Sequence, residues 1–173
     1  MITLTALADS DHPHFARDLF ESAFPETERP DFEDLEERPK NFHFMVATNE
    51  DDPVGILTYW TFEEFVYVEH FAIDEELRNM GFGKAVFLQF MLMHDKQVVM
   101  EVELPHDEVS ENRIEFYASM GLCSNPFDYY QPSYHGDETK VPMQIMSKLE
   151  LDDDEFEEMR KILYKEVYKV EGV

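Results

Sequence analysis

The sequence predicts an α/β fold with one central sheet. Strand-like and helical segments alternate along the 173 residues. Some strand-like segments, such as 65–73, contain runs of consecutive apolar residues, which are typical of strands covered on both faces. Hydrophobic residues make up 43% of the chain and aromatic residues 14%, which is enough for a buried core and excludes global disorder.

Local patterns predict the elements of the first half. We expect a short strand at 2–7 and a helix near 12–23, capped by Asp11 and with Pro13 in its first turn. The acidic stretch 21–37 predicts a loop and a short exposed helix. Further strands are expected at 42–48, 54–62 and 65–73.

The second half begins with a helix expected at 82–94, which is apolar nearly all round and should therefore be mostly buried. A strand is expected at 97–104. The next helix should be capped by Ser110 and end at Gly121, where a left-handed residue is favoured.

The last part of the chain predicts two strands around a loop within 123–148. The tail 153–170 has an apolar stripe at helical spacing and should form an amphipathic helix. We therefore expect one domain over 1–149, with a C-terminal helix over 150–173 packed on it.

The charge balance separates classes of ligand. Lys and Arg together number 14 against 39 Asp and Glu, which gives a formal net charge of −25. Such a surface repels phosphate backbones and attracts cations, so we expect a cationic substrate and no nucleic acid partner. Cys123 is the single cysteine, which excludes an intramolecular disulfide and a multi-cysteine zinc site. The first residues lack the basic region of a signal peptide, and no run of about 18 apolar residues occurs, so we expect a cytoplasmic protein without a membrane partner.

The most informative segment is the junction of a strand and a helix at 78–84. It reads Arg-Asn-Met-Gly-Phe-Gly-Lys and follows the apolar strand 65–73. Glycines let a backbone approach a bulky ligand, and the unpaired amides at a helix start suit a pyrophosphate. The pattern lacks the third glycine of a dinucleotide-binding fingerprint, and Ala85 stands where a P-loop has Ser or Thr. From these residues alone, a plain strand-to-helix turn remains open.

This segment resembles the acetyl-CoA loop of the GNAT N-acetyltransferases, which reads Arg-x-x-Gly-x-Gly. Residues 113–122 are similar to a second motif of that family, Leu-Tyr-x-x-x-Gly-Phe, because Phe116-Tyr117 and Gly121-Leu122 fill its positions. The resemblance covers most of 2–148. It implies a central mixed and splayed β-sheet flanked by helices, to which the tail helix is an addition.

The resemblance also implies that acetyl-CoA is the acyl-donor substrate and that no metal takes part. Its pyrophosphate would bind the loop formed by Arg78, Asn79, Met80, Gly81, Phe82, Gly83 and Lys84. Its pantetheine would pair with the backbone at the end of the preceding strand, Phe71, Ala72 and Ile73. An amide near Phe71 or Ala72 would face the acetyl oxygen.

Three side chains are candidates for catalysis. Tyr117 stands where the family often has a general acid near the sulfur; the alternative is a core aromatic residue. Glu69 and Glu101 lie in otherwise apolar strands, where burial would raise the pKa of a carboxyl toward that of a useful base. Some family members have a catalytic Glu at the position of Glu101, and strand alternation puts Glu69 on the same face as Phe71. An ordinary paired glutamate, or a water chain without a single base, remains open.

Other residues have structural interpretations. His70 should point to the opposite face from Glu69, as a core histidine. His12 and His14 have no sequence partner for a metal site. Cys123 is interpreted as a small buried hydrophobe. The aromatic segment 125–135 lies where the family lines its acceptor pocket, with a rigid loop as the alternative.

We therefore predict an acetyl-CoA-dependent N-acetyltransferase of the GNAT type. It would transfer acetyl to a primary amine of a cationic small molecule or peptide, by direct attack in a ternary complex. The alternative is a non-catalytic acyl-CoA-binding sensor or scaffold on the same fold. Another nucleotide-binding βα enzyme is disfavoured by the missing glycine. A homodimer is a possible assembly.

Overall fold

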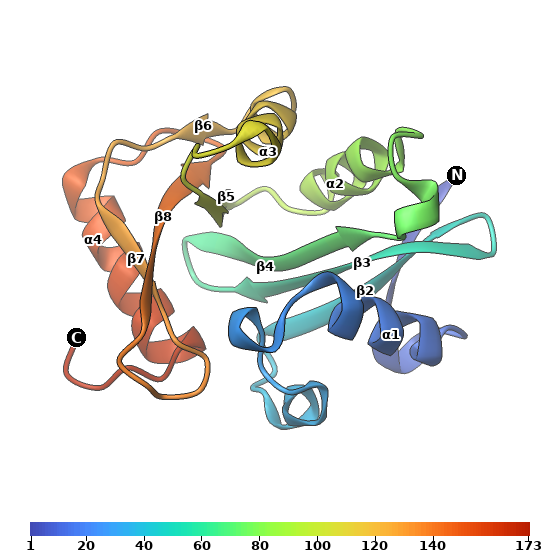
Figure 1. Cartoon of the computed structure of the whole chain (residues 1–173), viewed down its shortest axis with the longest axis horizontal. Helices are drawn as coiled ribbons and strands as arrows, with labels where there is room; N and C mark the ends of the chain where they lie inside the picture. Colours follow the sequence, from blue (N-terminus) through green and yellow to red (C-terminus); the bar gives the residue numbers. More distant parts are fainter. The chain divides into compact units, whose positions relative to one another are not determined.

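The computed structural model describes residues 1–173, which form two compact units (Figure 1). The first unit contains Met1–Glu26 and Asp31–Val98, and the second contains Thr27–Pro30 and Val99–Val173. Strands and helices occur in both, so the predicted α/β class is confirmed. None of the helices is long and apolar enough to cross a membrane.

The first unit is built on four antiparallel strands that pair in chain order. Consecutive buried residues in the third and fourth of them confirm that this sheet is covered on both faces. The strands are β1 (Ile2–Ala6), β2 (Phe42–Asn49), β3 (Asp52–Thr61) and β4 (Phe65–Ile73).

Two helices, α1 (Pro13–Ala23) and α2 (Phe82–Leu92), cover opposite faces of this sheet (Figure 1). Val46 of β2 belongs to the apolar cluster under α1, and the next residue, Ala47, belongs to the cluster under α2. This alternation places successive β2 side chains in two separate cores.

Two details of these helices differ from expectation. No side chain caps α1, whose N-cap residue is His12, so the predicted Asp11 cap is wrong. The prediction that α2 is mostly buried is also wrong. Val86, Phe87 and Phe90 are buried, but Leu92 is 82% exposed. An apolar composition did not indicate burial here because α2 covers only one face of the sheet.

The short helix predicted in the acidic stretch forms at Phe32–Glu37, and a further helical turn that was not predicted forms at Glu26–Glu28. The predicted short helix is anchored rather than fully exposed, because Leu35 is buried and Phe32 packs beside it in the α1 cluster.

The ladder between β3 and β4 contains one irregularity. Thr58 pairs with His70, and the next residue, Tyr59, pairs with Val68, so Glu69 is an extra residue in β4. Such a β-bulge breaks the strict alternation of side chains along the strand.

The second unit is organised around β8 (Lys140–Ser147). This strand pairs antiparallel with three others, β5 (Gln97–Glu103), β6 (Cys123–Ser124) and β7 (Tyr129–Pro132). The predicted strand at 97–104 and the strand pair within 123–148 are confirmed. Cys123 is partly exposed rather than buried.

Helix α3 (Glu108–Ala118) begins at Asp107 and not at Ser110. The Asp107 carboxylate accepts a hydrogen bond from the Ser110 amide at 2.8 Å, and the Asp107 amide donates to the Ser110 hydroxyl at 3.1 Å. The two residues form a reciprocal capping box, so the predicted Ser110 cap is corrected to Asp107. The helix ends before Gly121, whose φ of +94° is the left-handed conformation that was predicted.

The tail forms α4 (Asp153–Ile162), which continues into a π-helical turn, Leu163–Val167. The Phe156 ring stacks on Phe127 with ring centroids 4.3 Å apart, and Tyr164 packs edge-on against Tyr129 of β7. The tail helix therefore packs on the rest of the second unit through aromatic rings.

Candidate active site

The loop between β4 and α2 ends in a helix start that is open to an anion. Gly81 immediately precedes α2, has a φ of +86° and offers no side chain to cap the helix. A β-carbon at Gly81 would meet no atom within 4 Å, so the backbone conformation rather than crowding requires glycine here. The first amides of α2 therefore lie uncapped at the positive end of the helix dipole.

Basic and flexible side chains flank this helix start. Arg78 is exposed, and its Nε donates to the Ile73 carbonyl at 3.3 Å, which ties the loop to the end of β4. Lys84 is exposed in the first turn of α2. Asn79 has a left-handed φ of +62°, and Met80 is 64% exposed. The loop thus presents cations, amides and an apolar side chain at the surface of the first unit.

The end of β4 supports this loop from both faces of the sheet. Phe71 packs on Phe87 of α2 with ring centroids 5.5 Å apart. Ala72 packs in the α1 cluster, and Ile73 belongs to the α2 cluster. Their backbones pair antiparallel with β3 from Gly55 to Leu57.

Glu69 does not lie on the face of Phe71, as strand alternation predicted. Its carboxylate contacts Arg38 and the indole of Trp60, and the Trp60 ring packs on Phe42, which belongs to the α1 side of the sheet. Phe71 faces α2. The bulge at Glu69 is the physical reason, because the extra residue reverses the expected facing of its side chain.

The Glu69 carboxylate forms a buried ion pair. Its side chain is 0% exposed and that of Arg38 is 12% exposed. Arg38 donates to both oxygens, at 2.6 and 3.2 Å, and Trp60 Nε1 donates at 2.8 Å. The Arg38 guanidinium also lies over the Trp60 ring, 5.0 Å from its centre.

This ion pair changes what Glu69 can do. Burial by itself would raise its pKa, but the charge of Arg38, with smaller contributions from His70 and Trp60, outweighs burial, and the net pKa is lowered. The expected rise in pKa therefore does not occur at Glu69, whose carboxylate is held by the Arg38 guanidinium and the Trp60 indole.

His70 is the core histidine that the sequence predicted. It is 4% exposed, its Nδ1 lies 3.3 Å from the Thr58 hydroxyl, and its ring packs against Phe20 and Phe24. Its side chain lies on the same side of the sheet as that of Glu69, again because of the bulge.

Glu101 of β5 lies at the centre of a polar cluster in the second unit. Its carboxylate accepts hydrogen bonds from the Tyr129 hydroxyl, the Gln131 side-chain amide and the Tyr168 hydroxyl, the last at 2.6 Å. Burial and the Glu101 charge raise the pKa of Tyr129, so this phenol keeps its proton as a donor. Glu101 is partly buried, and these three donors are neutral groups.

Tyr117 lies in the last turn of α3 and is 6% exposed. Its ring packs edge-on against Phe116. Burial raises the pKa of its hydroxyl, and the charge of Arg113 offsets part of that rise. The hydroxyl therefore remains protonated throughout the physiological range.

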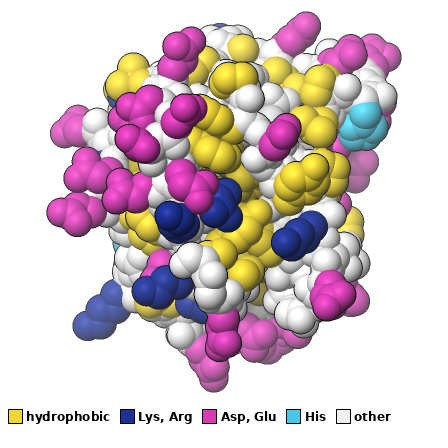
Figure 2. Space-filling view, turned by 90° about the vertical axis from the view of Figure 1, so that its left-hand side faces the viewer, with side chains coloured by type: hydrophobic (Ala, Val, Ile, Leu, Met, Phe, Trp, Pro, Cys, Tyr) yellow, Lys and Arg dark blue, Asp and Glu magenta, His cyan; other side chains and the backbone are white.

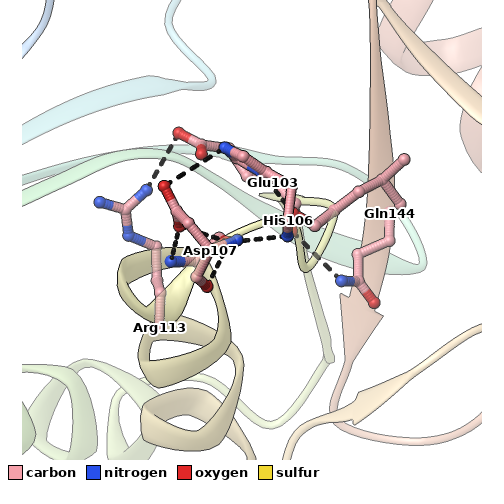
Figure 3. A network of polar contacts seen from close by, with 7 residues as sticks. Glu103, His106, Asp107, Arg113 and Gln144 are labelled. Atoms are coloured by element: carbon pink, nitrogen blue, oxygen red, sulfur yellow. Dashed lines mark hydrogen bonds and ion pairs between the residues drawn. The ribbon is translucent and has the colours of Figure 1, made fainter.

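Glu103, two residues after Glu101, is a surface residue. Its carboxylate lies 3.2 Å from Arg113 of α3, and the two side chains are 41% and 46% exposed. Figure 3 shows this pair beside His106, Asp107 and Gln144. This is an ordinary exposed salt bridge, and such pairs contribute little to stability.

The sequence did not single out Arg38 or Tyr168. Arg38 could have been identified as the basic residue that directly follows an acidic run. The signal for Tyr168 was a second tyrosine four residues after Tyr164 on the tail helix, which places both on one face. Tyr129 and Gln131 were included only within the aromatic segment 125–135.

A search of curated proteins found no match. Among solved structures, the chain is similar to a protein from Bacteroides thetaiotaomicron assigned to the GNAT family as an acetyltransferase, with 35% identity, a TM-score of 0.90 and 99% coverage of both chains. It shares its fold with an aminoglycoside 6′-N-acetyltransferase complexed with coenzyme A, at 17% identity, a TM-score of 0.58 and coverage of 86% and 96%. It also shares it with Arabidopsis thaliana Naa50 in complex with a bisubstrate analogue, at 16% identity, a TM-score of 0.59 and coverage of 86% and 98%.

The model of the acetyltransferase (GNAT) family matches residues 10–122, which is more than half of the chain. The matched range includes the loop at Arg78–Lys84 and the helix that carries Tyr117. The chain therefore belongs to the GNAT acetyltransferase family and is an acyltransferase.

Proposed function

We propose that this enzyme transfers acetyl from acetyl-CoA to a primary amine of a cationic acceptor by direct attack. The observation that carries the proposal is the uncapped start of α2 behind Gly81, with Arg78 and Lys84 exposed beside it. A helix N-terminus with open amides and flanking cations suits a pyrophosphate. The open space above Gly81 fits the close approach of such a group.

Acetyl transfer by this route needs a donor for the oxyanion, a proton for the thiolate and an unprotonated amine. We assign backbone amides near Phe71 and Ala72 to the oxyanion and the Tyr117 hydroxyl to the thiolate. The amine nitrogen attacks the acetyl carbon to form the nitrogen–carbon bond and a tetrahedral oxyanion, and the carbon–sulfur bond breaks as this oxyanion collapses. An acceptor that enters as an ammonium ion loses two protons in all, of which the thiol keeps one and solvent takes one.

For the base, the contacts favour Glu101 over Glu69. Both Glu69 oxygens bind Arg38, and its pKa is lowered, so it is a weak proton acceptor. Glu101 is held by phenol and amide donors. We propose that Glu101 acts on the acceptor side, either as the base or through a water.

The first prediction concerns the helix start. Gly81→Asp should weaken acetyl-CoA binding at least about tenfold, because a carboxylate there repels phosphate at the end of the dipole where anions are favoured. Calorimetry gives the dissociation constant. Gly81→Asn is the matched control, since it has the same shape and tolerates a positive φ but carries no charge. Equal affinities of the Asp and Asn variants would contradict the assignment.

A second prediction concerns the acceptor's charge. Acidic side chains gather at the left and along the margins of the face drawn in Figure 2, while hydrophobic side chains and a smaller group of Lys and Arg lie nearer its centre. With a net charge of −25, the surface should steer a cationic amine toward the enzyme and oppose acetyl-CoA. Raising ionic strength from about 0.01 M to about 0.15 M shortens the screening length from about 30 Å to about 8 Å.

We therefore expect the KM for the amine to rise with salt, while the KM for acetyl-CoA stays constant or falls. Initial rates at several salt concentrations measure both constants. A neutral or anionic best acceptor, or an amine KM that ignores salt, would show that the acidic surface does not select the substrate.

The proposal as a whole is tested by thiol release from acetyl-CoA in the presence of three acceptors. These are a linear triamine, an aminoglycoside and a peptide with a free amino end followed by arginines. Amine-dependent release with an acetylated product supports transfer. Saturable acetyl-CoA binding with no release on a broader amine panel would instead favour a binding module.

A further inference from the structure

The hydrogen bonds around Glu101 come from two separate parts of the second unit. Tyr129 and Gln131 belong to β7, two residues apart and therefore on one face of the strand. Tyr168 belongs to the tail and directly follows the π-helical turn. The pairing of β5 and β7 with β8 also places Glu101 and Tyr129 on one face of the sheet. Glu101 pairs with Ile145 and Tyr129 with Met143, which are alternate residues of β8 and share a face.

The Tyr168 hydroxyl forms hydrogen bonds with both Glu101 and Gln131. It donates to Glu101 Oε2 at 2.6 Å and accepts from the Gln131 amide at 3.2 Å, while Gln131 donates to the same Oε2. The three groups form a closed triangle, so the carboxylate cannot rotate without breaking hydrogen bonds to both partners. Tyr168 is 6% exposed, and its ring packs against Tyr134 with centroids 5.1 Å apart, which fixes the phenol in turn.

We propose that Tyr168 is a positioning residue for Glu101, which makes the C-terminal segment a working part of the acyl-transfer site. This inference rests on the proposed function, in which Glu101 acts on the acceptor. A carboxylate that accepts a proton or orients a water has to be held within a fraction of an ångström. Tyr168 supplies one of the donors that hold it.

Tyr164 provides a matched control within the same segment. It is a buried tyrosine four residues earlier and packs on the same β7 residue, Tyr129. Its hydroxyl, however, donates to the backbone carbonyl of Tyr130 and not to Glu101. Tyr164→Phe and Tyr168→Phe therefore remove the same atom from the same part of the fold, but only the second removes a donor from Glu101.

The experiment measures steady-state kinetics with acetyl-CoA and the best acceptor of the three-amine panel. We expect Tyr168→Phe to lower kcat between about 10- and 100-fold, as for other small misplacements of a catalytic group. The KM for acetyl-CoA and the urea midpoint of Tyr168→Phe should match those of Tyr164→Phe, whose kcat should stay near that of the unmodified enzyme.

The decisive readout is the same substitution in a Glu101→Gln background. If Tyr168 acts through Glu101, its removal costs no further activity there. An equal loss in both backgrounds, an unchanged kcat for Tyr168→Phe, or an unchanged kcat for Glu101→Gln would each overturn the inference while leaving acetyl transfer intact. If the unmodified enzyme transfers acetyl to no amine, the proposed function fails, and the inference fails with it.

Discussion

Replacing Arg38 by methionine is expected to lower the free energy of unfolding by about 3–5 kcal/mol. The substitution leaves the Glu69 carboxylate ionised, with 0% of its side chain exposed and the Trp60 indole as the side-chain donor that still contacts it. An uncompensated buried charge is among the largest single destabilising changes in a protein. Urea unfolding at neutral pH measures the loss.

Two other variants separate the charge from the packing. The double variant Arg38→Met with Glu69→Gln should recover most of the stability, because a neutral amide replaces the unpaired charge. Arg17→Met should change little, since the Arg17–Glu33 pair is exposed on both sides. A double variant no more stable than Arg38→Met would show that the guanidinium acts by packing alone.

The pH dependence of this loss follows from the lowered pKa of Glu69. A depressed folded-state pKa adds stability above the unfolded value, near 4.3, and that contribution is lost as the pH falls through the folded pKa. In the Arg38→Met variant, burial should raise the pKa of Glu69. This carboxyl then takes up a proton at a higher pH than in the unmodified protein, and its buried charge is neutralised. The stability gap should therefore be widest at neutral pH and narrow below about pH 5, and a gap independent of pH would contradict the ion-pair interpretation.

Tyr117→Phe is expected to lower kcat by about 10- to 1000-fold, the scale of general acid–base assistance, while the dissociation constant for acetyl-CoA changes little. The hydroxyl is buried and its pKa is raised, so it carries its proton at every pH at which the enzyme would be assayed. Loss of this group would leave the departing thiolate without its donor. Single-turnover rates with the preferred amine measure the effect.

Tyr59→Phe is the control for this substitution. Tyr59 is also buried, its pKa is also raised by burial, and its ring stacks on His43 in the first unit. Removing the Tyr59 hydroxyl should leave kcat unchanged. A Tyr117→Phe variant as active as Tyr59→Phe would show that Tyr117 is a core aromatic residue and not the general acid.

Some features could be predicted because they depend on a few neighbouring residues. The helix start at Gly81 and the left-handed Gly121 follow from local glycine chemistry, and both occur. The residue that caps α3 was harder to predict, because Asp107 and Ser110 lie three residues apart and both are good N-cap residues. The sequence alone does not show which of the two precedes the helix. In the structure Asp107 is the N-cap, and the two residues form hydrogen bonds to each other's backbone amides.

The facing of Glu69 could not be predicted from alternation. It depends on one extra residue in β4, which is set by pairing with β3 and by Arg38, a residue 31 positions earlier in the chain. Tyr168 was missed for a related reason. Apolar periodicity indicates which residues face the core, but it does not identify a phenol whose hydroxyl reaches a carboxylate 67 positions away.

The π-helical turn Leu163–Val167 determines which way Tyr168 faces. The Tyr168 amide donates to the Leu163 carbonyl, five residues back, at 3.2 Å, so this turn holds one residue more than an α-helical turn. A regular α-helix over the same residues would carry Tyr168 about 100° further round the helix axis, because each α-helical residue turns the chain by that angle. Tyr168 would then swing away from Glu101 although no side chain of the cluster had been altered. The extra residue of the π-helical turn thus keeps the end of the tail in register with the carboxylate, and deleting the exposed Lys165 would leave a four-residue α-helical turn with the same register.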